Sequence, residues 1–210
     1  PGSAVPDAFA LEEDDRHHEV LASRLRASKP AALIAQRPVG FVDELVRQTI
    51  ELLRRPGATV GIVVNRVKTA RQVHQRLEEL RPGVAHLLTG RMRPFDRANL
   101  DQSLIGRIRA GRERTDDESP IAVVATQTIE AGADFDFDGL VCECASLDAL
   151  RQRFGRLDRL GTLKSTARGV VVARTDTFKD DPVYGDAIGL TWTWLNSVAT
   201  DATVDFGIEA

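Results

Sequence analysis

Cysteines and long apolar runs are scarce in this 210-residue sequence, and each scarcity excludes a class of protein. Two cysteines cannot form the disulfide framework of a small secreted domain. They lie as Cys142-x-Cys144 in an apolar run, which favours buried thiols over a metal-binding pair. No stretch reaches the ~18 apolar residues of a membrane helix, and no signal-peptide pattern opens the chain. A reduced, cytoplasmic compartment is therefore the expectation.

Motifs that bind triphosphates and metals are also missing. No Gly-x-x-x-x-Gly-Lys-Ser/Thr loop occurs to cradle phosphates, and no Asp-Glu-x-His or Asp-Glu-Ala-Asp segment occurs to hold magnesium. The four histidines form no His-Asp dyad of a metal nuclease, and the His17-His18 pair is interpreted as surface residues of a helix. We therefore predict no metal ligand in these 210 residues.

The net charge of −3 argues, taken alone, against a nucleic-acid binder. The charge is unevenly distributed, however. Residues 1–15 carry five acidic and no basic side chains, whereas residues 151–168 carry six basic and one acidic. The basic charge is thus concentrated in one segment, where an anionic partner would bind.

Short apolar runs alternate with helical patterns along the chain. The runs are typical of strands buried on both faces, and the alternation predicts an α/β fold with a mostly parallel sheet flanked by helices. We expect an acidic, helical lead-in over 1–40, one compact lobe over 41–198 and a tail over 199–210. The predicted strands are 59–64, 84–88, 121–125, 140–144 and 169–173, and the main helices are 41–53, 69–80, 94–110, 147–157 and 187–195.

The segment Gln152-Arg-Phe-Gly-Arg-Leu-Asp-Arg159 carries the basic charge. On one continuous helix Gln152, Arg156 and Arg159 share a face, apart from the apolar side chains. Two guanidinium groups on one face favour a phosphate between them. The alternative is an ordinary solvated basic face.

Two further segments follow predicted strands, where parallel sheets place their functional loops. Thr126 and Gln127 begin the first, which runs through Gly132 to Asp134. The glycine permits a ligand to approach the backbone closely, and the aspartate can accept a hydrogen bond from a ribose hydroxyl. The second segment is Thr89-Gly90, followed by arginines at 91, 93 and 97 at the start of a predicted helix, a position that favours anions. Taken singly, each is also compatible with an ordinary connection or a basic surface helix.

Together, in this order and spacing, the segments resemble the second RecA-like lobe of a superfamily 2 helicase. The strand at 60–65 looks like motif IV, the segment 126–134 like motif V and the segment 152–159 like motif VI, the arginine-finger motif. The resemblance extends over about 59–173 and implies a three-layer RecA-like domain. The glutamine at the head of motif VI and the segment Thr191-Trp-Thr-Trp-Leu195 are similar to the Cas3-type CRISPR-associated helicase–nuclease of type I systems, most of all to the variant subtype whose nuclease domain follows the helicase.

This resemblance implies roles for particular residues. Arg156 and Arg159 would reach the β- and γ-phosphates of ATP, and Gln152 would sense the γ-phosphate or contact the first lobe. Gly132 and Asp134 would lie near the ribose. The residues that would hold the backbone of one nucleic-acid strand are Asn65, Thr89, Gly90, Arg97, Thr126 and Gln127.

The resemblance also implies partners. ATP and Mg²⁺ would be bound mainly by a first RecA-like lobe outside this chain, so the 210 residues would bind ATP weakly and not hydrolyse it. The expected partners are single-stranded DNA, the first lobe, a nuclease domain and a Cascade-type effector complex. That complex would act in CRISPR interference, which is an antiviral defence. No membrane is expected as a partner. The alternatives are a lobe of a DEAD-box-like RNA helicase and a non-catalytic RecA-like adaptor that binds protein or RNA.

Overall fold

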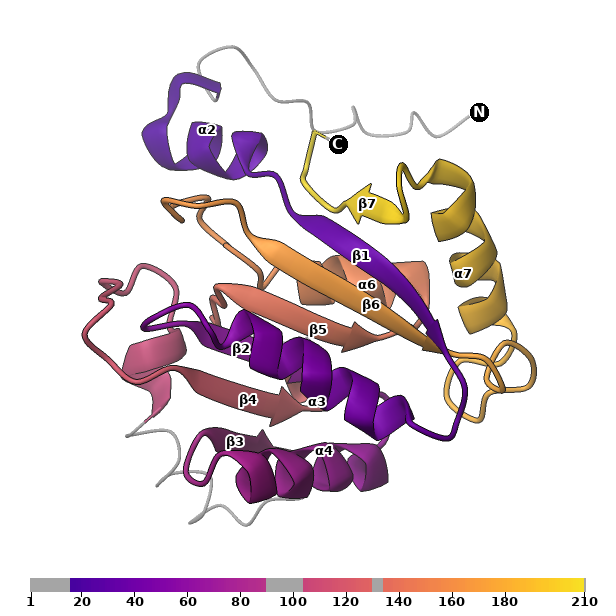
Figure 1. Ribbon diagram of the computed structural model, residues 1–210. Coiled ribbons are helices and arrows are strands. Elements are labelled where there is room, and N and C mark those ends of the chain that lie inside the picture. Colours follow the sequence, from indigo (N-terminus) through magenta and orange to yellow (C-terminus); the bar gives the residue numbers. More distant parts are fainter. Residues whose placement is uncertain (1–15, 90–103, 130–133, 210) are drawn as a thin grey trace, which may run out of the picture.

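The structure, a computed structural model, describes residues 16–89, 104–129 and 134–209. Seven strands form one sheet in the order β3-β4-β2-β5-β6-β1-β7 (Figure 1). Every neighbouring pair is parallel except β1 with β7. The strands are β1 (Pro30–Gln36), β2 (Thr59–Val63), β3 (Ala85–Leu88), β4 (Ile121–Ala125), β5 (Gly139–Glu143), β6 (Arg168–Arg174) and β7 (Thr203–Asp205).

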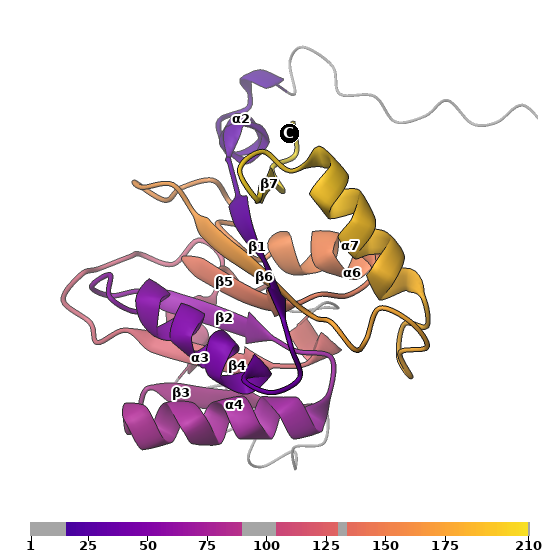
Figure 2. The ribbon, with the colours of Figure 1, turned by 45° about the vertical axis from the view of Figure 1, so that its right-hand side comes forward.

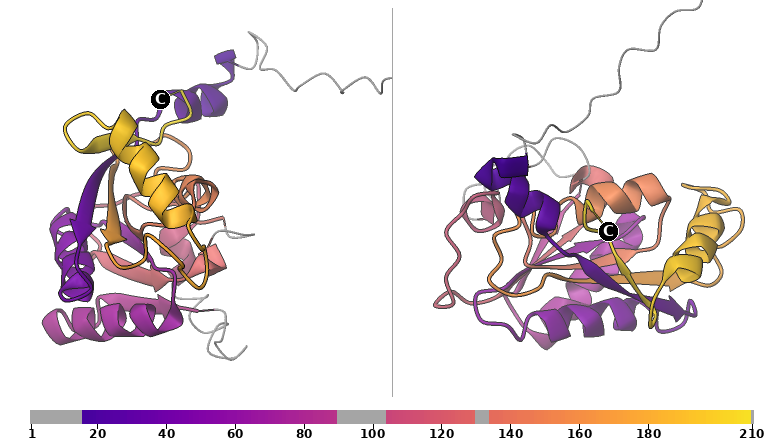
Figure 3. Two further views of the ribbon diagram at one scale, coloured as in Figure 1. Left: turned by 90° about the vertical axis from the view of Figure 1, so that its right-hand side faces the viewer. Right: turned by 90° about the horizontal axis from the view of Figure 1, so that it is seen from above.

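Helices cover both faces of the sheet, which confirms the predicted three-layer α/β architecture (Figure 3). The helices α3 and α4 pack on one face, and α6 and α7 lie on the other. The short helix α2 precedes β1 and lies beside the segment that follows β7 (Figures 1 and 2). Their bounds are α2 (Glu19–Arg26), α3 (Phe41–Leu52), α4 (Val67–Leu80), α6 (Leu147–Phe154) and α7 (Ala187–Val198), with a 3-10 turn η1 at Gln127–Ile129.

The core is divided by the sheet into two apolar clusters. Along β2, Val60 and Ile62 face α3 and α4, whereas Val63 belongs to the opposite cluster. This follows from the alternation of side chains along a strand. Because both faces are covered, every residue of the central strands β2, β4 and β5 is buried.

The five predicted strands and the predicted helices at 41–53, 69–80 and 187–195 are confirmed, with boundaries that differ by at most three residues. The predicted helix 94–110 falls largely outside the described residues, and its described part is helical over 104–108. Two strands, β1 and β7, were not predicted, and they extend the sheet beyond the expected lobe boundaries of 41 and 198. Within the described ranges, no helix is long and apolar enough to cross a membrane.

Candidate nucleotide and nucleic-acid site

The prediction of one helix over 147–157 is wrong at its carboxyl end. Helix α6 ends at Phe154, and Gly155 caps it. The Phe154 ring lies against Gly169 of β6, where an added Cβ would come within 2.4 Å of the ring. Glycine has a low helix propensity, and after it the chain turns so that the Phe137 amide donates to the Arg156 carbonyl at 2.8 Å. Arg156 and Arg159 therefore lie in the turn after α6, not on the helix with Gln152.

This turn brings together three of the residues predicted at the nucleotide site. Arg156 Nε donates to the Ile129 carbonyl at 3.2 Å, which ties the turn to η1. Arg159 Nε lies 3.1 Å from Asp134 Oδ1. Burial and the positive charge of Arg159 both lower the pKa of the Arg156 guanidinium, as expected for two cations placed close together. Gln152 is exposed on α6. Gly132, the fifth residue of this prediction, lies outside the described residues.

The residues predicted at the nucleic-acid strand follow the carboxyl ends of β2, β3 and β4. Gln127 Nε2 donates to the Asn65 carbonyl at 3.1 Å, so these two loops are in contact. Thr126 is buried, whereas Thr89 and Gln127 are half-buried. Gly90 and Arg97 lie outside the described residues. The structure thus joins the loops after β2 and β4 at one edge of the sheet.

Asn65 departs from the prediction. Its Nδ2 donates to the Cys144 carbonyl at 2.8 Å, and its Oδ1 accepts from Arg153 Nη2 at 3.1 Å. The residue is buried. Because both ends of its amide are bonded in the interior, the Asn65 side chain cannot make the expected phosphate contact in this structure.

Arg153 is the residue that sequence reasoning missed at this edge. It is fully buried and donates to the Glu143 carbonyl at 2.9 Å and to the Tyr184 hydroxyl at 3.1 Å, besides Asn65. A signal was present, because position 153 lies between Leu150 and Leu157 on the apolar face of the predicted helix. We call Asn65, Glu143, Arg153 and Tyr184 the carboxyl-edge network.

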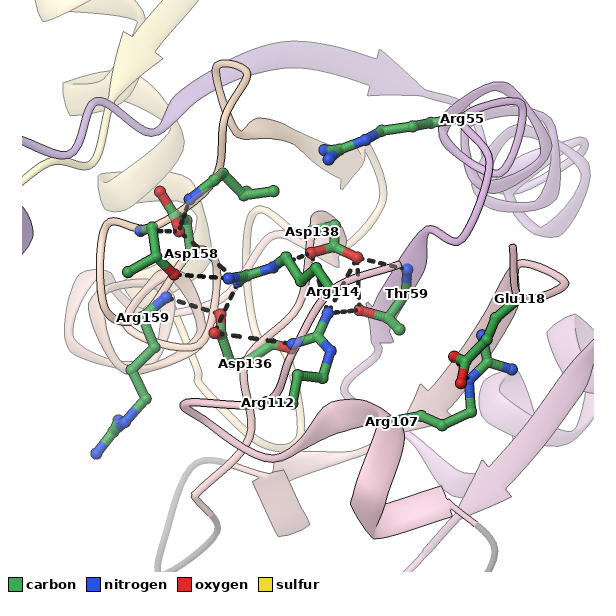
Figure 4. Close-up of polar contacts among 12 residues, drawn as sticks. Arg55, Thr59, Arg107, Arg112, Arg114, Glu118, Asp136, Asp138, Asp158 and Arg159 are labelled. Atoms are coloured by element: carbon green, nitrogen blue, oxygen red, sulfur yellow. Dashed lines mark hydrogen bonds and ion pairs between the residues drawn. The ribbon is translucent and has the colours of Figure 1, made fainter. Parts of the chain in front are cut away.

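A second group of buried charges lies at the opposite edge of the sheet (Figure 4). We call Arg112, Arg114, Asp136, Asp138 and Asp158 the amino-edge cluster. Residues 112–120 have the hydrophilic composition of a solvated surface loop, yet the Arg112 and Arg114 side chains are only 7% and 18% exposed. Their partners, three aspartates, lie more than twenty residues away in the sequence.

The contacts of this cluster are short and reciprocal. Arg114 Nη2 lies 2.7 Å from Asp136 Oδ2, and Arg114 Nε lies 2.8 Å from Asp138 Oδ1. Arg112 Nη2 donates to Asp138 at 3.0 Å and to the Thr59 hydroxyl at 2.7 Å. Such charge-assisted bonds are the strongest hydrogen bonds in proteins. They fix β5 and the loop before it to the amino end of β2.

The amino-edge cluster also holds the turn that carries the two arginines. Asp136 Oδ1 accepts from the Arg159 amide at 2.9 Å (Figure 4). Asp158, in the left-handed region at φ 39°, accepts from the amides of Thr162 and Leu163 through one carboxylate oxygen. The backbone on both sides of Arg159 is therefore fixed, whereas its side chain is 29% exposed.

A mostly parallel sheet covered on both faces, with Ile129 and Asp134 in contact with the turn after α6, is the arrangement of the RecA-like lobe of a helicase. Residues 56–162 match the family described as CRISPR-associated nuclease/helicase Cas3, C-terminal. The match includes half of the chain, and the chain belongs to this family.

Similar proteins agree with this assignment. The CRISPR-associated nuclease/helicase Cas3 of Methanothermobacter thermautotrophicus is 35% identical over 100 residues, which is 48% of this chain and 11% of that protein. A solved CRISPR-associated protein superposes with a TM-score of 0.65 at 22% identity, over 94% of this chain and 22% of its own. The T. fusca Cas3-ADP structure superposes with a TM-score of 0.60 at 19% identity, over 80% and 20%.

The same fold occurs in a chain of a CRISPR RNA-guided surveillance complex in its pre-nicking state, with a TM-score of 0.60 at 20% identity, over 80% of this chain and 22% of that one. The curated relatives are much longer than this sequence, which spans 11% to 16% of their length.

Proposed function

We propose that this chain is the second RecA-like lobe of an ATP-dependent DNA helicase or translocase that acts in CRISPR interference. Arg156 and Arg159 would act on the phosphates of ATP held mainly by a first lobe. The observation that carries the proposal is the meeting of Arg156, Arg159 and Asp134 in one place, with the backbone of Arg159 fixed from behind by Asp136.

The contacts of Arg159 suit a group that must exchange partners. Its ion pair with Asp134 is exposed on the aspartate side, where the side chain is 61% exposed. Exposed ion pairs contribute about 0–1 kcal/mol, so a triphosphate can replace the carboxylate at little cost. A phosphate group can also accept hydrogen bonds from two guanidinium groups at once, and its negative charge relieves the repulsion between Arg156 and Arg159.

The residues present here suit the phosphates of ATP but include no proposed ligand for Mg²⁺. The two arginines suit the phosphates, and arginine fingers contribute on the order of 10³–10⁵ to the rate of phosphoryl transfer when the rest of the site is in place. Mg²⁺ would be held on the first lobe. Gln152, exposed on α6, would contact the γ-phosphate or that lobe, while Gly132 and Asp134 would lie near the ribose.

The nucleic-acid contact is proposed at the carboxyl edge of the sheet. Gln127 and Thr89 are half-buried there, beside Thr126, and Gly90 and Arg97 follow Thr89 in the sequence. Contacts of this kind go to the phosphodiester backbone, which gives affinity without reading sequence. Asn65 would serve by positioning Gln127 through its carbonyl, not by touching the strand.

The family match also supports a proposal about partner proteins. The first lobe and the nuclease domain would lie in the remainder of a longer chain, and a Cascade-type surveillance complex would recruit it. The family match favours this function over a DEAD-box-like RNA helicase. A non-catalytic adaptor would not need the paired arginines, and the experiment below distinguishes it.

The test is Arg156→Ala in the full-length parent protein. We expect DNA-stimulated ATP hydrolysis to fall by about 10³-fold or more, with single-strand binding largely retained. Arg71→Ala, an exposed arginine on α4, is the matched control and should leave hydrolysis unchanged. Normal turnover in the Arg156 variant would overturn the proposed role, and a parent without any ATPase would support the adaptor.

A further inference from the structure

A small pocket lies between α2, the carboxyl end of α6 and the segment after β7. Its volume is about 160 Å³. On this measure a cavity needs only about 10–15 Å³ to hold one water molecule, so the pocket has room for a phosphate group. Figures 1 and 2 show α2 beside the segment that follows β7. The eight lining residues are Arg24, Lys29, Arg151, Gly155, Arg159, Phe206, Gly207 and Ile208.

The lining is cationic. Four of the eight lining residues are basic and none is acidic. Among the described residues, Arg24 and Arg151 form no hydrogen bond or ion pair, and Arg24 Nε is buried without a partner. A buried donor left unsatisfied costs free energy, so an acceptor entering the pocket would be stabilised by these groups.

Lys29 forms the inner wall. It is 5% exposed, and its Nζ donates to the Phe154 carbonyl at 3.2 Å. Burial lowers the pKa of this lysine, and the nearby charges of Arg24 and Arg159 lower it further, against the opposing effect of Asp158 and Asp136. An anion in the pocket would relieve this repulsion.

The carboxylates around the pocket have other partners. Asp205 accepts from Ser28 Oγ, from the Lys29 amide and from the Gly207 amide. Asp134 pairs with Arg159, and Glu209 with Arg16. The negative end of α6 also points here, and Arg151 in its last turn offsets part of that dipole. Arg24 likewise lies in the last turn of its own helix, α2.

We propose that this pocket binds a phosphate group, with Arg24, Lys29 and Arg151 as its ligands and Arg159 at its rim. Arg24, Lys29 and Arg151 take no part in the proposed ATP site, so phosphate binding here does not depend on the first lobe. The phosphate group can be inorganic phosphate or one phosphate of a nucleic-acid strand.

The experiment titrates the 210-residue chain with inorganic phosphate by calorimetry at low, constant ionic strength. The variant is Arg24→Ala/Arg151→Ala, and the matched control is Arg37→Ala/Arg71→Ala, which removes two exposed arginines elsewhere. We expect binding to the unmodified chain and to the control, and a loss of about tenfold or more in the variant. No binding of phosphate, or equal binding to variant and control, would overturn the proposal.

A second measurement does not depend on any substitution. In the unmodified chain, phosphate should shift the amide NMR signals of Gly155 and Gly207, which line the pocket. Unchanged signals would contradict the proposal even if phosphate binds elsewhere. The same titration with a short single-stranded oligothymidylate identifies the source. Shifts of these amides and displacement by inorganic phosphate would assign the group to a DNA strand, and shifts by inorganic phosphate alone would assign it to the free ion.

Discussion

The two edges of the sheet bury charge in opposite ways. At the amino edge, Asp138 accepts from two arginines, a hydroxyl and a backbone amide. At the carboxyl edge, the carboxylate of Glu143 accepts from one backbone amide, that of Asn65, at 2.7 Å. The nearby Arg153 bonds to the Glu143 carbonyl instead of the carboxylate.

The pKa values of the two acids therefore shift in opposite directions. Burial alone would raise both. For Asp138, the charge of Arg112 and the amide of Thr59 outweigh burial and hold its pKa below the ordinary value. For Glu143, burial dominates and raises the pKa. The ionised form of Asp138 is thus stabilised by the donors that bond to its carboxylate, whereas the nearby cations only partly offset the effect of burial on Glu143. At Asp136, in the same cluster as Asp138, burial also dominates and raises the pKa.

The largest expected effect is that of Asp138→Asn, which leaves Arg112 with an incomplete set of acceptors. Breaking a buried ionic contact costs about 3–5 kcal/mol, and we expect this loss of unfolding free energy in urea at pH 7. The stability due to ionised Asp138 is present above its unfolded pKa of about 3.9 and is lost as the pH falls through its lower folded pKa. The difference between variant and parent should therefore shrink in acid.

Glu113→Gln is the control for this variant. Glu113 is exposed next to Arg112 and has no described partner, so its substitution should change stability by less than about 0.5 kcal/mol. Equal effects of the two substitutions would show that the amino-edge cluster is not a buried ionic contact.

Arg153→Met should have the second largest effect. It deprives three acceptors of a donor, namely the Glu143 carbonyl, Asn65 Oδ1 and the Tyr184 hydroxyl. Because these acceptors are neutral, we expect a loss of about 2–4 kcal/mol, measured by urea unfolding. A loss larger than that of Asp138→Asn would reverse the comparison between the edges.

Glu143→Gln should have a small effect of opposite sign at neutral pH. An acid with a raised folded pKa favours the folded state below its unfolded pKa, and this contribution is lost as the pH rises through the folded pKa. The amide avoids that loss and can still accept from Asn65. Thermal unfolding at pH 7 should show equal stability or a gain of up to about 1 kcal/mol, and a loss of several kcal/mol would contradict the raised pKa.

Arg55→Ala should have the smallest effect. Arg55 lies near the amino-edge cluster (Figure 4). It donates once, to Ser165 Oγ at 3.0 Å, in an exposed contact. We expect a change below about 0.5 kcal/mol in urea unfolding. A larger effect would mean that the cluster extends to the surface.

The central strands could be predicted from the sequence because they are continuous apolar runs buried on both faces. Strand β1 escaped because only one of its residues is fully buried, because it is rich in alanine, and because it begins at Pro30, which also signals the end of a helix. Strand β7 has three residues and no pattern to recognise. Both occupy the side of the sheet where one face is less covered.

The candidate site was predictable in its residue types but not in its contacts. Arg156, Arg159 and Asp134 were identified together, whereas Arg112 and Arg114 looked solvated because their partners are distant in sequence. Asn65 was expected to face a ligand, but its side-chain oxygen accepts a hydrogen bond from Arg153 in the interior. Long-range pairing of polar groups leaves no local periodicity from which to infer it.

The pairing of β1 with β7 has a mechanical consequence. Pro30, where the chain enters β1, pairs with Asp205, where it leaves β7, and three residue pairs join the strands. A force applied through these two ends would pull the antiparallel pair apart from one side, so that its hydrogen bonds break one after another instead of together. The parallel core would carry load only after β7 had peeled away, so under such a force β7 would be the first strand to leave the sheet.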